Sequence, residues 1–371
     1  MSICLAFRRV SVSSLRQVRK THLSLMASMS TSMKAVVIHE YGNSSKLSYE
    51  DVPIPEPGPD ERIAMEKFTQ PLLLQQVLVK NHFAGLNFID TYVRQGIMKL
   101  VQPGGILGFE GAGTVEKLGS GVQGLSVGDR VAFGFIGSNA YSQYSKVGAK
   151  YAVKVPDQLT MEQAASTLWQ GFTAHAFACS SYPIKAGDKV LVHAAAGGVG
   201  SLITQIAKNT GAFVIGTTST EAKASKAREA GADEVILYSQ KDFVEEVNRI
   251  TDGKGVTVIY DGVGKTTFLK NFGCLARRGT VVLFGGASGR PEPLDTGVLA
   301  KGSFYVTYGV NFHFVEDPAE YSQRATELFT WLTEGKLKFS GGITVVPLSD
   351  VKKAHDMLEG RQTTGKVLLQ P

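Results

Sequence analysis

A short turn rich in alanine and glycine, residues 194–200, constrains the fold of this chain more than any other feature. The apolar run before it, residues 189–192, predicts a buried parallel strand, and residues 201–208 after it have the apolar spacing of a helix. A strand, a glycine turn and a helix in this order are typical of a dinucleotide-binding unit, because the helix N-terminus offers free N–H groups to a pyrophosphate. We therefore predict a cofactor site at Ala195, Gly197, Gly198, Val199 and Gly200.

The rest of the chain shows two kinds of pattern. Strands expected at 33–38, 77–81, 112–118 and 129–133 are short and joined by glycine turns, which suggests a compact barrel-like domain. Helices are expected across 161–179. Strands and helices then alternate, which predicts a parallel, doubly wound sheet: strands at 189–192, 213–216, 234–237, 256–260 and 279–284, and helices at 201–209, 221–230, 243–251 and 268–275. Helices at 319–335 and 349–359 and a strand at 366–370 are expected to complete the first domain.

Composition limits the class of protein. A chain of 371 residues with 43% hydrophobic residues and 41 glycines fits a globular α/β protein of two domains. No apolar stretch approaches eighteen residues, so no membrane insertion is expected. The three cysteines have no close spacing, and neither C-x-x-C nor H-x-x-x-H occurs. We therefore expect neither a disulfide framework nor a metal.

The net charge of +6 is concentrated at the N-terminus. Residues 1–33 contain five basic residues and no acid, which leaves a charge of +1 for the rest. Nucleic acid is therefore not expected as a main partner, since phosphate binding needs a basic face on the folded body. With eight serines and no continuous apolar core, residues 1–33 are predicted to be a targeting presequence. Mitochondrial import is expected; the alternatives are plastid import, or a cytosolic protein whose translation starts at Met26, Met29 or Met33.

The choice of dinucleotide depends on the end of the second strand. An NAD site usually has an acid there to bind the ribose 2′-OH. Residues 216–220 contain none, and Glu221 is the first acid to follow. The small hydroxyls of Thr218 and Ser219 and the nearby cation of Lys223 suit a 2′-phosphate. The sequence therefore favours NADPH.

Several further stretches resemble the zinc-free quinone oxidoreductases, the zeta-crystallin-like branch of the medium-chain dehydrogenase/reductases. The similarity runs from about Met33 to Pro371, and the matching motifs lie at 85–92, 108–113, 170–175, 193–200, 260–265 and 363–366. The resemblance implies a GroES-like β-barrel domain, 34–171 plus 309–371, into which a Rossmann NADPH-binding domain, 172–308, is inserted. It implies a homodimer or tetramer, and an active site in the cleft between the domains.

The resemblance also assigns residues. Asn87 and Phe109 stand where zinc-dependent relatives carry a cysteine and a histidine ligand, in agreement with a metal-free site. Residues that would bind the cofactor fall into three groups: Lys223, Tyr238 and Arg361 at the 2′-phosphate; Asn87, Tyr92, Gln170 and Thr173 near the nicotinamide; and Val263, Phe284 and Gly285 around the ring or ribose.

The implied activity is NADPH-dependent reduction of quinones or related enones, in which the cofactor supplies the hydride. The protein must stabilise the developing enolate or quinol oxygen, and Tyr92 and Asn87 are the expected donors. Asp90 is the third candidate catalytic residue, although holding its loop is the more favoured role. His175 and His193 are expected to be structural.

Two alternatives stay open. One is an alkenal or enone double-bond reductase with the same fold and cofactor. The other is an RNA-binding protein of the zeta-crystallin type, which the near-neutral body disfavours. Two departures from the family pattern concern the substrate and the surface: Met98 replaces an aromatic residue, and residues 62–76 form an insertion.

Overall fold

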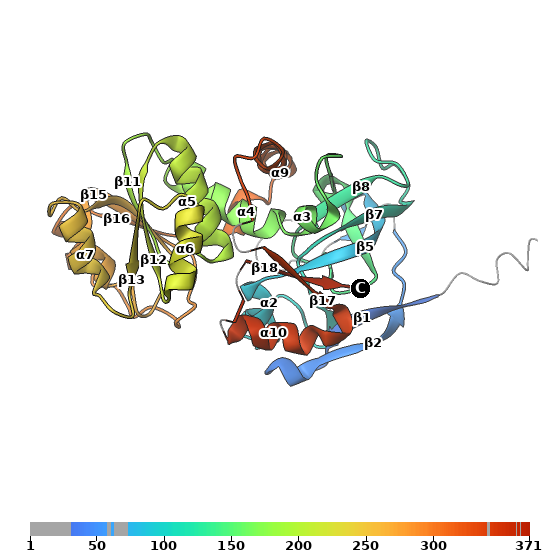
Figure 1. Cartoon of the computed structure of the whole chain (residues 1–371). Coiled ribbons are helices and arrows are strands. Elements are labelled where there is room, and N and C mark those ends of the chain that lie inside the picture. Colours follow the sequence, from blue (N-terminus) through green and yellow to red (C-terminus); the bar gives the residue numbers. More distant parts are fainter. Residues whose placement is uncertain (1–30, 58–60, 63–72, 340–341, 361, 364) are drawn as a thin grey trace, which may run out of the picture.

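The computed structural model describes residues 31–57, 61–62, 73–339, 342–360, 362–363 and 365–371. The described chain forms two lobes that lie side by side (Figure 1). Most of the predicted presequence falls outside the described residues, and so does Arg361. Among the described helices, none is long and apolar enough to cross a membrane.

One lobe contains a six-stranded parallel sheet in the order β13-β12-β11-β14-β15-β16. The first strand in the chain, β11, lies next to the point where the strand order reverses, as in a Rossmann fold. Helices α5 and α6 cover the face of the sheet nearer the second lobe (Figure 1). The strands are β11 (Lys189–Val192), β12 (Phe213–Thr218), β13 (Glu234–Leu237), β14 (Val256–Asp261), β15 (Leu275–Leu283) and β16 (Tyr305–Tyr308), and the helices are α5 (Gly198–Thr210), α6 (Glu221–Glu229), α7 (Phe243–Ile250) and α8 (Gly297–Ala300).

The other lobe is built on a largely antiparallel sheet in the order β10-β8-β7-β5-β18-β17, with β9 also paired to β5. The C-terminal strand β18 pairs with β5 on one side and β17 on the other, so the end of the chain returns to this lobe. A small sheet, β2-β1-β6, packs beside it. The strands are β1 (Ser32–Ile38), β2 (Leu47–Pro53), β5 (Gln76–Leu86), β6 (Gly105–Ile106), β7 (Glu110–Leu118), β8 (Arg130–Gly134), β9 (Tyr144–Gly148), β10 (Val153–Lys154), β17 (Ile343–Pro347) and β18 (Lys366–Gln370), and the helices are α2 (Phe88–Arg94), α3 (Met161–Ala165) and α10 (Val351–Glu359).

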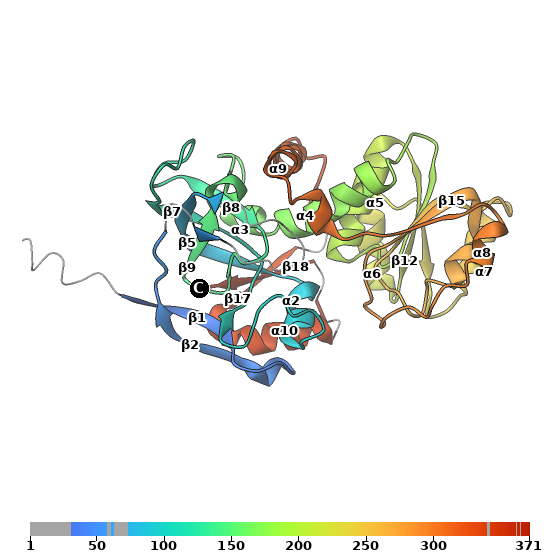
Figure 2. The ribbon, with the colours of Figure 1, turned by 180° about the vertical axis from the view of Figure 1, so that it is seen from behind.

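The predicted fold class, a Rossmann sheet inserted in a GroES-like domain, is confirmed. The chain crosses between the lobes through α4 (Leu168–His175), which continues into the π-helix η4 (Ala176–Ser181). It returns through the 3₁₀ turn η6 (Asn311–Phe314) to α9 (Pro318–Thr333), and α4 and α9 lie between the lobes in both views (Figures 1 and 2). Phe177 joins the two crossings, because its ring lies 5.3 Å from that of Phe284 and 6.1 Å from that of Phe314.

The helix predicted at 268–275 is wrong. The segment contains only the 3₁₀ turn η5 (Lys270–Gly273), and β15 already begins at Leu275. Long-range hydrogen bonds explain the difference: the Asn271 amide nitrogen donates to Asp261 at 2.8 Å, and the Thr267 hydroxyl donates to the same carboxylate. Side chains that bond in this way hold a local turn in place of a helix.

The inserted segment at 62–76 is described only at its ends. A two-residue strand, β3 (Glu61–Arg62), pairs with β4 (Leu73–Leu74) in an antiparallel ladder. The residues between these strands lie outside the described part of the chain. The two ends of the insertion therefore meet just before β5 begins.

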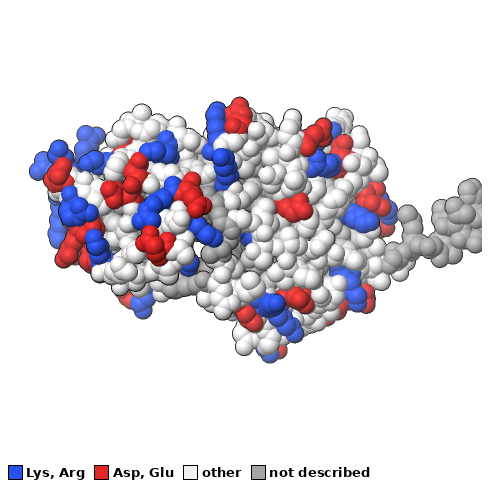
Figure 3. Space-filling view, in the orientation of Figure 1, with Lys and Arg blue, Asp and Glu red and all other residues white. Residues whose placement is uncertain are grey.

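Charged side chains of both signs are interspersed on the face drawn in Figure 3. Basic and acidic groups alternate over the Rossmann lobe, and much of the other lobe is uncharged on this face. This surface does not have the single-sign field that favours a nucleic-acid backbone.

Candidate active site

The glycine turn leads directly into α5, which has Gly197 as its N-cap. Among the described residues, no side chain forms a capping hydrogen bond to the first N–H groups of this helix. A Cβ at Gly200 would overlap the carbonyl oxygen of Ala194, which explains the glycine. Ala195 in place of the usual glycine is tolerated because Gly216 on β12 leaves room for its methyl group.

Gln170 brings the second lobe to the start of α5. A Cβ on Gly198 would overlap the Gln170 amide, so the two residues are in close contact. Gln170 lies on α4, which leads from the barrel lobe to the Rossmann lobe. A small cavity at this point is lined from both lobes by Gln170, Gly198, Ser201, Leu202, Phe339, Gly365 and Lys366. The helix terminus therefore faces polar groups of the other lobe, with Val199 half-buried beside it.

Apart from Arg361, which is not described, the residues predicted for the ribose phosphate lie at or just after the ends of β12 and β13. The Tyr238 N–H donates to the Thr218 carbonyl at 3.1 Å, and the Ser239 hydroxyl donates to the Ser219 carbonyl at 2.9 Å. Thr220 caps α6 by accepting from the N–H of Lys223 at 3.3 Å.

The nearest acid at this end of the sheet points to a different partner. Glu221 forms an ion pair with Arg228 at 2.6 Å, seven residues along the same helix. Because Arg228 engages the Glu221 carboxylate, this geometry disfavours a contact between Glu221 and a ribose hydroxyl. The ribose end therefore has hydroxyls and a lysine where an NAD site usually has an acid.

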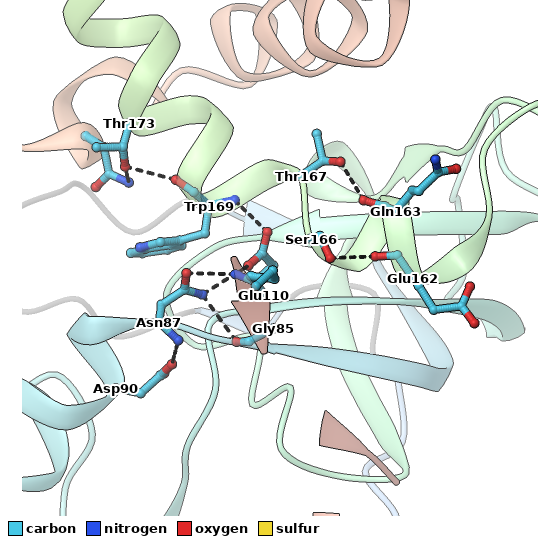
Figure 4. A network of polar contacts seen from close by, with 12 residues as sticks. Gly85, Asn87, Asp90, Glu110, Glu162, Gln163, Ser166, Thr167, Trp169 and Thr173 are labelled. Atoms are coloured by element: carbon cyan, nitrogen blue, oxygen red, sulfur yellow. Dashed lines mark hydrogen bonds and ion pairs between the residues drawn. The ribbon is translucent and has the colours of Figure 1, made fainter. Parts of the chain in front are cut away.

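Asn87 differs from its predicted role. Its side-chain amide nitrogen donates to the Gly85 carbonyl at 3.2 Å and to Oε2 of Glu110 at 3.0 Å (Figure 4). Both amide hydrogens are therefore occupied. Its Oδ1 accepts from the Lys366 ammonium at 2.9 Å, and the side chain is almost wholly buried. Asn87 is thus part of the supporting structure, and the geometry leaves no amide hydrogen for a substrate oxygen.

Glu110 and Lys366 form the centre of this network, and the sequence prediction missed both. The Lys366 ammonium lies 2.5 Å from Oε2 of Glu110. The other carboxylate oxygen, Oε1, accepts the Trp169 backbone N–H at 2.8 Å (Figure 4). A Cβ at Gly85 would overlap the same carboxylate, so the glycine makes room for it. The available signal was a charged residue at the start of a strand, followed by three small or apolar residues, as at Glu110 on β7 and Lys366 on β18.

Asp90 closes the first turn of α2. Its Oδ2 accepts the Asn87 backbone N–H at 2.7 Å and the Tyr141 hydroxyl at 3.0 Å. Burial raises the pKa of Asp90 to about 7, although both hydrogen bonds oppose this shift. Since the side chain is fully buried and bonded to its own loop, the structure supports a positioning role.

Tyr92 lies one turn after Phe88 on α2 and is only half-buried. Burial raises the pKa of its phenol above the ordinary value, and the nearby Tyr308 adds to the effect. A hydrogen bond with the backbone N–H of Gly286, in the Rossmann lobe, lowers this pKa. Tyr92 therefore stays protonated at neutral pH, and its hydroxyl lies where the two lobes meet.

The other residues predicted near the nicotinamide, the ring or the ribose have partners of their own. The Thr173 hydroxyl accepts from the Asn311 amide at 3.2 Å, a partner that the sequence did not suggest. Val263 is held by its N–H, which donates to Asp261 at 2.8 Å. Phe284 is half-buried beside Phe177, and a Cβ on Gly285 would lie 2.6 Å from the Gly262 carbonyl.

The two histidines have structural partners. His175 accepts from Arg324 at Nδ1 and bonds Glu327 through Nε2, each at 2.6 Å. His193 bonds Thr217 at 3.0 Å and Asn271 at 2.8 Å. Both ring nitrogens of each histidine are therefore occupied.

The donor set does not suit a metal. Asn87 and Glu110 already share the Lys366 ammonium, and Phe109 is a buried aromatic residue. In the part of the chain that the structure describes, no group of three or more histidine, cysteine, aspartate or glutamate side chains is placed to hold a metal ion.

Two protein families match parts of this chain. Residues 74–157 match the alcohol dehydrogenase GroES-like domain, and residues 198–331 match the zinc-binding dehydrogenase family. The word zinc in the second name describes the family as a whole. In this chain, Asn87 and Phe109 are not metal ligands of the usual kind.

Two relatives and one solved structure are similar along most of their length. Quinone oxidoreductase 1 of Escherichia coli is 39% identical over 85% of this chain and 97% of its own. The 2-haloacrylate reductase of a Burkholderia species is 38% identical over 91% of this chain and 98% of its own. The solved structure of Escherichia coli quinone oxidoreductase complexed with NADPH superposes with a TM-score of 0.82, at 36% identity, over 91% of this chain and all of that one. The chain therefore belongs to the quinone oxidoreductases of the medium-chain dehydrogenase/reductase superfamily.

Proposed function

We propose that this protein reduces quinones with NADPH as the electron donor, at the junction of its two lobes. The observation that carries the proposal is the meeting of two features there: the uncapped N-terminus of α5 in contact with Gln170, and the phenol of Tyr92 beside Gly286. The first suits a pyrophosphate and the second suits an oxygen that gains negative charge. The NADPH complex of the Escherichia coli relative supports the choice of cofactor.

The residues present fit the cofactor. Gly197 is exposed at the helix terminus, and the nearest atom to a Cβ built there would be the Ala194 carbonyl oxygen at 3.1 Å. A backbone open on this side can be approached closely by a phosphate. Lys223 and Tyr238, with Thr218 and Ser219, would hold the 2′-phosphate, and Arg361 is proposed as a further contact.

NADPH, when bound, supplies the hydride. Tyr92 then donates a hydrogen bond to the substrate oxygen on which negative charge develops, since its raised pKa keeps the phenol protonated. Asn87, Asp90 and Glu110 position the loop from which α2 begins, and they do so through buried hydrogen bonds. Gln170 and Thr173 position the cofactor from α4.

A double-bond reductase is the second candidate. It is favoured by the 2-haloacrylate reductase relative, whose substrate is an electron-poor alkene. The same phenol could support an enolate as well as a quinol oxygen, so the geometry does not separate the two reactions. Substrate turnover separates them.

The test follows absorbance at 340 nm for the purified chain from Met33 onward, with NADPH or NADH and with ortho-quinones, para-quinones or 2-alkenals. Oxidation of NADPH by quinones, much slower with NADH, supports the proposal. Turnover of alkenals alone moves the protein to the double-bond reductases. Tight NADPH binding without turnover of any substrate overturns the enzyme function.

Lys223→Ala tests the cofactor preference within the same assay. Loss of a charged contact to the 2′-phosphate lowers kcat/KM for NADPH about 10- to 100-fold and leaves that for NADH unchanged. Lys226→Ala, one turn along the same helix, is the control and keeps the preference.

Three further proposals concern the context of the enzyme. We propose a homo-oligomer, a dimer or a tetramer, for which light scattering on the purified chain is the test. Within the described residues, β16 pairs only with β15 and leaves one sheet edge open.

We propose that residues 1–33 direct mitochondrial import, which a fluorescent-protein fusion with and without this segment tests. The division into 34–171 plus 309–371 and 172–308 is the third proposal, and limited proteolysis tests it.

A further inference from the structure

We propose that Tyr308 is a substrate-contacting residue that favours flat ring quinones over acyclic enones. The proposal rests on the proposed reductase function and adds a specificity residue to it. Tyr308 lies on the Rossmann lobe, opposite Tyr92 on the barrel lobe, and takes no part in hydride or proton transfer. The two tyrosines would contact the substrate from different lobes.

The backbone places Tyr308 at the site. It is the last residue of β16 and pairs with Leu283, which directly precedes the predicted cofactor contacts Phe284 and Gly285. The next residue, Gly309, donates its N–H to Leu283 at 2.7 Å. A Cβ on Gly309 would overlap the ring of Phe177, so this turn is held firmly against the crossing between the lobes.

The chain beyond Tyr308 leads directly to the nicotinamide region. Asn311, three residues later, donates to the Thr173 hydroxyl at 3.2 Å. Phe312 packs against Trp169 with ring centroids 5.6 Å apart, and Trp169 donates its N–H to Glu110. Tyr308 is therefore bracketed on both sides by segments that form the site. Its nearness to the Tyr92 phenol agrees with this placement, because it contributes to the raised pKa of Tyr92.

Tyr308 is free to meet a ligand, since the residue is 59% exposed. Two other large apolar side chains near Tyr92 are exposed as well, Phe88 at 42% and Ile97 at 68%. Phe88 shares a face of α2 with Tyr92, because the two are four residues apart on the helix. Ile97 bonds back to the Tyr92 carbonyl through its N–H at 3.0 Å.

Tyr308, Phe88 and Ile97 together make up the proposed rim, which is exposed aromatic and aliphatic surface near Tyr92. Sites of this composition bind an apolar ring and fix it with a few polar contacts. Aromatic faces also stack on flat rings in an offset arrangement, which a short acyclic enone cannot match. The rim also offers an aromatic contact in a chain where Met98 replaces the aromatic residue of relatives.

The test compares kcat/KM for 9,10-phenanthrenequinone and for but-3-en-2-one in the full chain. Tyr308→Ala is expected to lower the quinone value about 3- to 10-fold, mainly through KM, and to change the enone value less than twofold. Tyr308→Phe keeps the ring and is expected to retain the selectivity. The NADPH Kd, measured by fluorescence, is expected to stay unchanged in both variants.

Tyr305→Ala is the matched control. Tyr305 lies on the same edge strand with nearly the same exposure, 57%, but at its opposite end, paired with Thr280. An effect through assembly of the edge strand would appear in both variants, whereas a substrate contact appears only at Tyr308. An unchanged quinone-to-enone ratio in Tyr308→Ala, or an equal change in Tyr305→Ala, overturns the proposal while the reductase function stands. A wild-type chain that binds NADPH but reduces neither substrate overturns the reductase function itself.

Discussion

The Lys366 ammonium lies 2.5 Å from the Glu110 carboxylate, and both side chains are sealed off from solvent. A buried charge without its partner is costly, so Lys366→Met is expected to lower the free energy of unfolding by about 3–5 kcal/mol. The double variant Lys366→Met, Glu110→Gln removes both charges and is expected to recover much of this loss. Urea denaturation at a fixed pH measures all three proteins.

The exposed pair Lys34–Asp51, with its charged atoms 2.6 Å apart, is the control. Lys34→Met is expected to cost less than about 1 kcal/mol, because solvent screens the pair. If Lys366→Met lowered the free energy of unfolding no more than Lys34→Met does, the buried Lys366–Glu110 pair would not stabilise the protein.

Asp90 is expected to make stability depend on pH. Its pKa is raised by burial to about 7, whereas an unfolded aspartate titrates near 3.8. Between these values the folded protein holds a proton that the unfolded chain has released, so the free energy of unfolding falls as the pH rises. The slope is at most about 1.4 kcal/mol per pH unit and ends above pH 7.

Asp90→Asn removes this titration. Urea denaturation at pH 5, 6, 7 and 8 is expected to show the variant gaining stability relative to the wild type up to about pH 7, and then no further change. Asp157→Asn is the control, since this side chain is fully exposed. A constant difference between Asp90→Asn and the wild type across the range would mean that Asp90 is ionised throughout.

The sequence predicted much of the Rossmann lobe because its signals are local. Strands β11 and β13, and β18 in the other lobe, begin and end at the predicted residues, since apolar runs and flanking turns define them. The helix expected at 268–275 failed because Asn271 and Thr267 bond to Asp261, which no local pattern shows.

The candidate site divides in the same way. The glycine turn was visible in the sequence because seven consecutive residues form it. The orientation of Asn87 was not, because its partners Glu110 and Lys366 lie 23 and 279 positions away in the chain. A residue's type can therefore indicate a site, but which of its atoms are free depends on partners that only the fold brings together.

Tyr92→Phe tests the hydroxyl proposed to support the substrate oxygen. Removing one such donor is expected to lower kcat about 100-fold and to leave the NADPH Kd unchanged, because the bond is made to the developing charge. Asn87→Ala is expected to lower the melting temperature as well as kcat, since it breaks the hydrogen-bond network with Glu110. Steady-state kinetics and thermal unfolding separate the two variants. Equal kcat in wild type and Tyr92→Phe would remove Tyr92 from the reaction.

Chelation is expected to leave the activity unchanged. The position between Asn87 and Glu110 is filled by the Lys366 ammonium, and a divalent cation there would meet a positive charge. Activity before and after dialysis against EDTA, with and without added zinc, is the measurement. Loss of activity on dialysis that zinc restores would show that the protein uses a metal after all.

Gly198→Ala tests the contact between the lobes at the cofactor turn. The new Cβ would overlap the Gln170 amide, and the flexible end of that side chain has to move. Overpacking of this kind costs about 1–3 kcal/mol. If Gln170 helps to position the cofactor, a loss of this size in binding free energy raises the Kd for NADPH about 5- to 150-fold. The double variant Gly198→Ala, Gln170→Ala removes the overlap as well as the amide. Recovery of the wild-type Kd in the double variant would show that Gly198→Ala acts through the overlap alone, whereas a Kd that stays raised assigns the loss to the Gln170 amide.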